Sequence, residues 1–125
     1  MNSRGSGREW LSKMGRASDE PFKVSKYYTP DESFPGVPVW WFEFPKTQVI
    51  NKSGKFLNLL CAVAPNSLDY HHFRVPTDFL IAHEAELGRR DGRNLFSLYL
   101  CAEPSRLFRE IRGDGGVEFG PFKVD

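Results

Sequence analysis

The side chains with the widest chemical range in this sequence are its three histidines, and all three lie within residues 70–87. His71 and His72 are neighbours in a run that alternates like a β-strand, so their imidazoles are expected to point to opposite faces. His83 lies on the apolar stripe of a predicted helix, where a partly buried imidazole is favoured over a catalytic one. A zinc motif that began at His83 would need a second histidine at Leu87. We therefore expect no metal site.

One face of the same predicted strand carries the only catalytic candidates, Tyr70, His72 and Arg74. They would place a phenol, an imidazole and a guanidinium in a row at intervals of about 7 Å. Such a row could hold a phosphate or a carboxylate, or could stack on a base. Metal-independent cleavage of a phosphodiester is the catalytic hypothesis, whereas a solvated sheet face is the simpler and favoured interpretation.

Arginine is concentrated between Gly88 and Gly113, where six arginines meet only three carboxylates. The candidate ligand-binding residues are these arginines and one tryptophan: Arg89, Arg90, Arg93, Arg106, Arg109, Arg112 and Trp41. Arg106, Arg109 and Arg112 recur every three residues, so a helix would bring them close together. Arginine forks suit phosphate and carboxylate, and the ordinary alternative is a solvated helix face with local ion pairs.

Four strands must position these side chains, and alternation predicts them at residues 39–44, 56–63, 70–75 and 94–101. The first strand puts Trp40 and Trp41 on opposite faces. One of the two indoles is then in the core, and the other is either covered or exposed for stacking or partner binding. The second strand is the most apolar, which indicates a central strand covered on both faces.

Three helices are predicted between and around these strands, at about residues 10–14, from the N-cap Thr77 to Gly88, and from Pro104 to Gly113. Four prolines within residues 17–38 disfavour regular strand pairing and indicate an extended arm that lies across the domain.

The element order α-β-β-β-α-β-α predicts a single small α+β domain. We expect one mixed sheet of four to five strands, packed by two or three short helices. The strand–helix–strand unit at 70–101 is long enough for a right-handed parallel crossover, and the first three strands would be antiparallel neighbours. Residues 1–38 are expected to form an N-terminal helix and a proline-rich arm that pack on an α+β core of residues 39–125.

This order resembles the α-β-β-β-α-β core of restriction-endonuclease-like domains of the PD-(D/E)XK type, over about residues 8–101. The resemblance implies a Mg²⁺ site built from an acidic residue near the second strand and an Asp/Glu-x-Lys on the third. Here the second strand offers Asn58, and the third reads His72-Phe73-Arg74. The resemblance therefore implies a non-catalytic relative rather than a working Mg²⁺ nuclease.

The composition suits one folded domain of 125 residues, because 40% of the residues are hydrophobic. The net charge of +1 gives no global attraction to nucleic acid or membrane, so any such binding must come from a local patch. Cys61 and Cys101 both lie in apolar runs and are expected to be buried free thiols. No apolar leader follows Met1, so a cytoplasmic protein without membrane contact is expected.

The preferred function is a non-enzymatic binding or accessory module that holds nucleic acid or an acidic partner through arginine and aromatic side chains. The first alternative is a degenerate or metal-independent nuclease. The second is a structural subunit that meets a protein partner through Trp41 or through Tyr27 and Tyr28. No nucleotide-binding glycine loop and no nucleophile elbow is present, so no cofactor is expected and an enzyme is the less favoured class.

Overall fold

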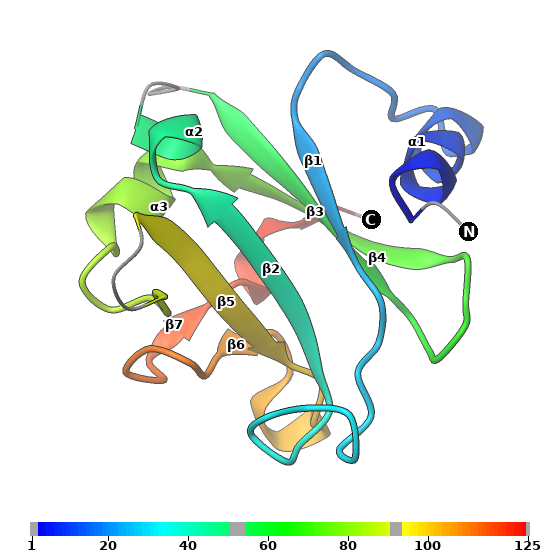
Figure 1. The fold of residues 1–125 in the computed structure, drawn as a ribbon. Helices are drawn as coiled ribbons and strands as arrows, with labels where there is room; N and C mark the ends of the chain where they lie inside the picture. The colour runs from blue at the N-terminus through cyan, green and yellow to red at the C-terminus, as the bar shows by residue number, and fades with distance from the viewer. Residues whose placement is uncertain (1–2, 51–54, 91–93, 125) are drawn as a thin grey trace.

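The computed structural model describes residues 3–50, 55–90 and 94–124, and Figure 1 shows how its elements are arranged. The helices are α1 (Ser3–Lys13), α2 (Thr47–Ile50) and α3 (Thr77–Ala82), with the 3₁₀ turns η1 (Pro104–Arg106) and η2 (Gly120–Phe122). The strands are β1 (Phe22–Ser25), β2 (Val39–Pro45), β3 (Phe56–Ala62), β4 (Tyr70–Pro76), β5 (Leu95–Cys101), β6 (Arg109–Glu110), β7 (Val117–Glu118) and β8 (Lys123–Val124).

The strands form two four-stranded sheets. Sheet A has the order β1-β3-β4-β8, and sheet B has the order β2-β5-β6-β7. Every neighbouring pair is antiparallel except β1 and β3, which run parallel. In Figure 1, β2 and β5 run side by side in one layer, and β3 and β4 belong to a separate layer. The domain is therefore α+β, as predicted, and is built as two stacked sheets.

The inward faces of the two sheets bury one shared core. Sheet B contributes the aromatic and leucine side chains of Trp40, Phe42, Phe44, Phe96, Leu98 and Leu100. Sheet A contributes Leu57, Leu59, Cys61, Phe73 and Val75. These residues alternate along their strands with residues of the outer faces, as period-two packing requires. The alternation in the sequence therefore separates the two faces of each strand, and the structure decides which face is inward.

The two sheets are joined where the chain passes from β1 to β2. Tyr28 and Val39 exchange backbone hydrogen bonds at 3.0 and 3.1 Å. Ser25, the last residue of β1, accepts a hydrogen bond through its hydroxyl from the Trp41 backbone N–H at 2.8 Å. The edge of β2 is consequently fastened to the segment that leaves sheet A, and the pair of sheets closes along this side.

The outer face of sheet A is covered by α1. A second, smaller apolar cluster lies between them and consists of Trp10, Leu11, Leu60, Ala62 and Tyr70. Because the other face of β3 lines the main core, six of its seven residues are buried. The prediction that the second strand is central and covered on both faces is confirmed.

The prediction of one mixed sheet is wrong. The segments 39–45 and 95–101 pair with each other in sheet B, whereas 56–62 and 70–76 pair in sheet A. No parallel crossover therefore connects β4 to β5, and the element order that resembles restriction-endonuclease-like domains does not describe this fold. The helices are too short to cover one broad sheet, so the two apolar sheet faces cover each other.

The two later helices are much shorter than predicted. The helix that starts at Thr77 ends at Ala82, and Pro76 rather than Thr77 is its N-cap. The helix expected from Pro104 is a single 3₁₀ turn of three residues. It ends at its C-cap Leu107, whose φ of −55° and ψ of 127° are extended, and Phe108 then has a left-handed φ of 66° with its ring in the core against Trp40 and Phe73. No helix in the described part of the chain has the length and apolarity to cross a membrane.

The expected extended arm contains a strand that sequence reasoning missed. Phe22–Ser25 pairs in parallel register with residues 58–61 of β3. Pro21 comes immediately before the strand and Pro30 well after it, so no proline interrupts the ladder. The expectation that prolines exclude regular pairing here is wrong, because only their positions within the segment matter.

Candidate functional site

The outer face of sheet B carries the polar and aromatic side chains of β2 and β5. Antiparallel pairing places Trp41 opposite Tyr99, and Glu43 opposite Ser97. Their neighbours along each strand point inward, because Phe42 and Leu98 belong to the core. The register of this one strand pair therefore brings an indole, a phenol, a carboxylate and a hydroxyl to one surface.

Two further segments add to the free edge of β5 and bring arginines to this surface. Residues 88–90 lie along the first half of the strand, where the Ser97 N–H donates to the Gly88 carbonyl at 2.9 Å. Residues 109–112 lie along the second half, where the Ile111 N–H donates to the Tyr99 carbonyl at 2.9 Å. Segments about twenty residues apart in sequence thus become neighbours along one strand.

The buried carboxylate of Glu110 holds these two segments together. Its Oε1 accepts hydrogen bonds from the backbone N–H groups of Gly88 and Gly113, at 2.9 and 2.8 Å. Its Oε2 accepts from the N–H groups of Tyr99 and Arg112, both at 2.9 Å. Four donors therefore stabilise one buried charge, which is what burial of an ionised carboxylate requires.

Ser97 is the centre of the polar contacts on the outer face. Its hydroxyl accepts hydrogen bonds from Arg112 Nη1 at 2.7 Å and from Trp41 Nε1 at 3.2 Å. The same hydroxyl donates to Glu43 Oε2 at 3.1 Å. Arg90 Nη1 donates to the other oxygen of that carboxylate at 2.8 Å. The two arginines, from the two segments on the edge of β5, are thus fixed by one hydroxyl and one carboxylate.

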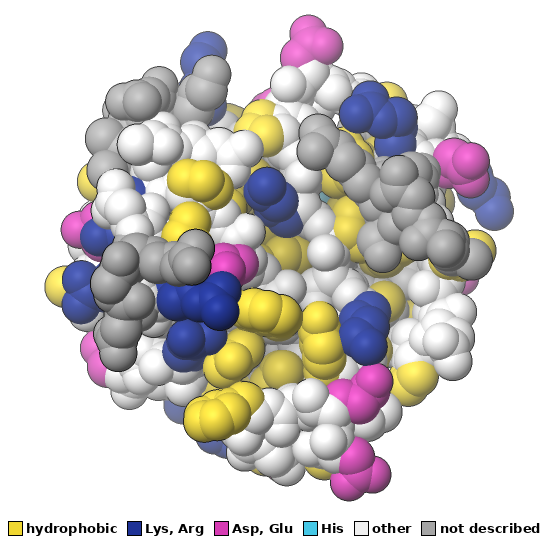
Figure 2. Space-filling view, in the orientation of Figure 1, with side chains coloured by type: hydrophobic (Ala, Val, Ile, Leu, Met, Phe, Trp, Pro, Cys, Tyr) yellow, Lys and Arg dark blue, Asp and Glu magenta, His cyan; other side chains and the backbone are white. Residues whose placement is uncertain are grey.

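Aromatic rings continue this surface toward the segment after β1. Trp41 is 37% exposed, and its ring lies 6.2 Å from that of Tyr28 and 6.5 Å from that of Tyr99. The Arg112 guanidinium lies over the Tyr99 ring at 5.0 Å. The surface is called the β2–β5 face below and consists of Tyr28, Trp41, Glu43, Arg90, Ser97, Tyr99 and Arg112. In Figure 2, hydrophobic side chains gather over β2 and β5, with Lys and Arg side chains on both sides of them.

The charge of the β2–β5 face is unevenly compensated. Arg90 pairs with the Glu43 carboxylate, whereas Arg112 contacts only neutral side-chain groups among the described residues, the hydroxyls of Ser97 and Tyr99. Arginine keeps its positive charge at every physiological pH. Within the described ranges, the face therefore has one guanidinium, that of Arg112, that forms no salt bridge with a carboxylate.

The predicted ligand-binding residues divide between this face and other places. Trp41, Arg90 and Arg112 come together on the β2–β5 face. Arg106 pairs with Glu103 beside η1, and Arg109 pairs with Glu118 across β6 and β7. The expectation that Arg106, Arg109 and Arg112 share one helix face is wrong, because the chain is extended after Leu107. The last two predicted residues are Arg89, which forms a bridge with Phe96, and Arg93, which lies outside the described residues.

Sequence reasoning missed three members of the β2–β5 face, Glu43, Ser97 and Tyr99, and named Tyr28 only as a residue that could meet a protein partner. The alternation of residues 94–101 already placed Ser97 and Tyr99 on one face. The pairing of this strand with β2 was the missing information, since it alone sets Glu43 opposite Ser97.

The predicted catalytic row does not face solvent. Tyr70 and His72 are buried, and the Trp10 indole packs on both rings in T-shaped contacts, with ring centroids 5.7 and 6.0 Å apart. Arg74 alone is exposed, where its guanidinium lies 3.5 Å above the Phe56 ring. The expectation of a solvated sheet face is therefore wrong at two of three positions, because α1 covers this part of sheet A.

A polar chain runs beneath α1 from His72 to Arg74. His72 Nε2 lies 2.6 Å from Asn58 Oδ1, and the Asn58 amide donates to Glu20 at 3.1 Å. Arg74 closes the chain with two bonds to the Glu20 carboxylate, at 2.9 and 2.6 Å. The Arg74 guanidinium holds the pKa of Glu20 below its usual value. The chain thus satisfies the buried amide and ends on an ion pair at the surface.

The two other histidines have ordinary packing roles. His71 lies against the core rings of Trp40 and Phe108, on the face predicted for it, and burial lowers its pKa. His83 is half-buried against Phe79 and contacts Glu86 at 3.2 Å. Among the described residues, no three His, Cys, Asp or Glu side chains lie close enough together to bind a metal ion. Both cysteines are buried and free, as the sequence predicts, and burial raises the pKa of the Cys61 thiol.

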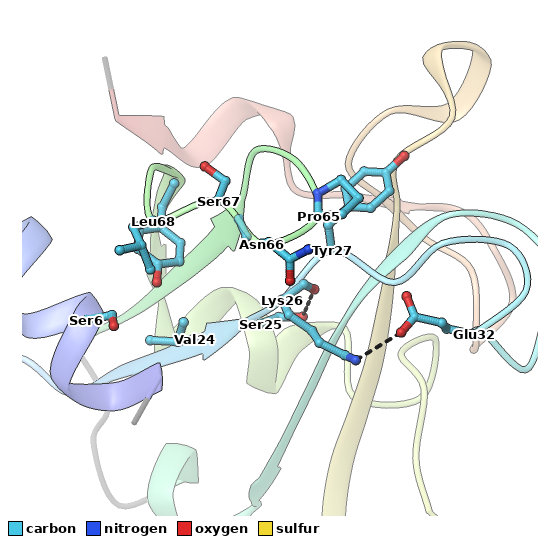
Figure 3. A pocket seen from close by; sticks show the side chains of 12 residues that line it. Ser6, Val24, Ser25, Lys26, Tyr27, Glu32, Pro65, Asn66, Ser67 and Leu68 are labelled. Atoms are coloured by element: carbon cyan, nitrogen blue, oxygen red, sulfur yellow. Dashed lines mark hydrogen bonds and ion pairs between the residues drawn. The ribbon is translucent and has the colours of Figure 1, made fainter. Parts of the chain in front are cut away.

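Another hollow, with a volume of about 390 Å³, lies between α1, β1 and the turn after β3. Figure 3 shows Ser6 and Val24 on the side of α1, and the ion pair of Lys26 and Glu32 on the opposite side. Since these two charges neutralise each other, the lining favours no particular class of ligand.

No protein-family model, curated protein sequence or solved structure matched this chain. The assignment of a function therefore depends on the geometry of the β2–β5 face.

Proposed function

We propose that this protein is a non-catalytic binding module that holds single-stranded nucleic acid on its β2–β5 face. The observation that carries the proposal is the cluster of solvent-facing aromatic rings beside arginine guanidinium groups on one rigid strand pair. Exposed bases stack on aromatic rings and on guanidinium planes, while arginine also contacts the phosphates.

The arrangement of the face favours binding of single-stranded rather than double-stranded nucleic acid. Tyr28, Trp41 and Tyr99 form a row of rings across the sheet, and neighbouring rings are 6.2 and 6.5 Å apart. Such a row suits successive unpaired bases, whose flat faces are hidden in a duplex. Arg90, two residues along the strands from this row, provides a charge at a distance suited to a backbone phosphate.

The test is a binding titration of a short, labelled single strand by fluorescence anisotropy. We expect binding at low ionic strength and a loss of affinity as the salt concentration rises from about 50 to about 200 mM. Binding releases the cations condensed on the phosphates, and this release becomes less favourable as the salt concentration rises. Trp41→Ala should weaken binding at least about fivefold, since a stacked base contributes about 1–3 kcal/mol. Arg90→Ala should weaken binding and lower the slope of log K against log salt by about 0.7.

Two matched variants control for charge and position. Glu43→Gln removes the carboxylate that competes with a phosphate for Arg90, so it should strengthen binding. Arg8→Ala removes an exposed arginine on α1, away from the face, and should leave the affinity unchanged. Absence of binding at low salt, or equal weakening by Arg8→Ala and Arg90→Ala, would contradict the proposal. Binding of an acidic peptide in place of the nucleic acid would assign the face to a protein partner.

A further inference from the structure

A hollow of about 340 Å³ adjoins the aromatic end of the β2–β5 face. It is lined by Phe34, Pro35, Tyr99, Ile111 and Arg112. Its volume lies at the lower end of small-molecule sites, which span about 300–1,000 Å³. Phe34 is 94% exposed, although exposure of an apolar phenyl ring to water is unfavourable. The hollow is therefore suited to a small, flat group that would cover this ring.

The walls of the hollow are apolar, and its polar end is a hydrogen-bond donor. Arg112 Nη1 already donates to the Ser97 and Tyr99 hydroxyls. A guanidinium has five N–H groups, two of them on this nitrogen, so three are left that donate to no described residue and can meet a ligand. Those contacts hold the Arg112 fork in place, and the Tyr99 ring lies below it at 5.0 Å. A ligand must then combine a flat aromatic body with a pair of adjacent acceptors.

We propose that this hollow binds one guanine base of the strand held on the β2–β5 face; the inference rests on the proposed function. The base packs on the Phe34 ring, and its O6 and N7 acceptors receive the Arg112 fork, which itself lies over the Tyr99 ring. Arginine to guanine O6 and N7 is the commonest specific pairing between proteins and base edges. A purine also covers more of the Phe34 ring than a pyrimidine does.

The test compares four single strands that differ only at one central base, set in a run of thymidines. We expect the strand with guanine to bind about tenfold more tightly than those with adenine, cytosine or thymine. Arg112→Lys keeps the charge but not the fork, so it should abolish the preference and retain most of the thymidine-strand affinity. Phe34→Ala should weaken binding of the guanine strand more than binding of the other strands. The Phe34 side chain is exposed, so its removal should leave the fold intact.

The outcomes separate this inference from the proposed function. Equal binding of all four strands, or a guanine preference that survives Arg112→Lys, overturns the guanine site and leaves the binding face intact. No binding of any strand at low salt overturns both. Circular dichroism melting should show that Arg112→Lys is folded, so that its altered preference comes from the lost fork. If Arg112→Lys is unstable, the binding data for Phe34→Ala test the inference independently.

Discussion

At the scale of single residues, Ser97 decides how the β2–β5 face is held. Its hydroxyl uses both acceptor positions, for Trp41 and Arg112, and its proton for Glu43. Because Ser97 is fully buried and satisfied in this way, it orders the exposed side chains around it without contacting solvent. A serine in an apolar strand has no such role until the opposite strand is known, so this residue could not be recognised from the sequence.

His72 is the second residue whose role depends on its surroundings. The Asn58 amide nitrogen donates to Glu20 and to the Pro21 carbonyl, so Asn58 Oδ1 faces His72 and accepts the proton of Nε2. The lone pair of Nδ1 is then buried, with no hydrogen-bond partner in the described part of the chain. Burial, with a smaller contribution from the positive charge of Arg16, lowers the pKa of His72 to about 4.

This lowered pKa predicts a loss of stability in acid. Between pH 6.5 and about pH 4 the unfolded chain takes up a proton at His72 that the folded chain does not. The contribution of His72 to the free energy of unfolding is thus fully present above pH 6.5. It falls by about 3 kcal/mol as the pH drops to about 4. His72→Gln, which can still donate to Asn58, should remove most of this loss, as measured by urea unfolding at a series of pH values.

His83→Gln is the matched control, because this half-buried histidine lies outside the polar chain beneath α1. It should show the same acid loss as the wild type. An unchanged acid loss in His72→Gln would mean that His71, whose pKa burial also lowers, is the group responsible.

At the scale of elements, the face depends on two short segments that meet on β5. Glu110 accepts four backbone hydrogen bonds at this junction, and the backbones approach very closely. A Cβ atom on Gly88 would lie 2.1 Å from the Ser97 carbonyl oxygen, and one on Gly113 would lie 2.1 Å from that of Glu86. The sequence predicts that helices end at Gly88 and Gly113. In the structure, each of these glycines is instead a point where two chain segments are in close contact.

Gly88→Ala and Gly113→Ala should each destabilise the protein by about 2–3 kcal/mol, since the methyl group would force backbone apart. Gly120→Ala should change stability by less than about 0.5 kcal/mol, because nothing lies within 4 Å of the added Cβ. Urea unfolding measures all three variants. Equal costs at Gly88 and Gly120 would show that the junction is not closely packed.

At the scale of the whole molecule, two sheets share one core, so they should unfold together. Leu59 is fully buried in sheet A, whereas Trp40 and Trp41 belong to sheet B, and the Trp40 indole N–H also donates to the Ala62 carbonyl of β3 at 2.8 Å. In a Trp10→Phe background, Leu59→Ala should lower the urea midpoint of tryptophan fluorescence and of circular dichroism equally, at a cost of about 2–5 kcal/mol. The exposed Leu68→Ala should move neither midpoint. Separate transitions for the two signals would show that the sheets are independent.

The sequence by itself determined four strands, the buried free cysteines and the α+β class, because alternation of apolar residues is a local property. It also singled out Trp41, Arg90 and Arg112 by residue type. Only the tertiary structure decided which strands pair, since pairing depends on contacts between segments far apart in the chain.

That pairing produced both the surface and the burial that sequence reasoning misjudged. It placed Arg90 and Arg112 beside Trp41, separated Arg106 and Arg109 from them, and covered Tyr70 with α1. A side chain's type shows what chemistry it can do, but its exposure and its partners follow from how distant segments bury their apolar faces.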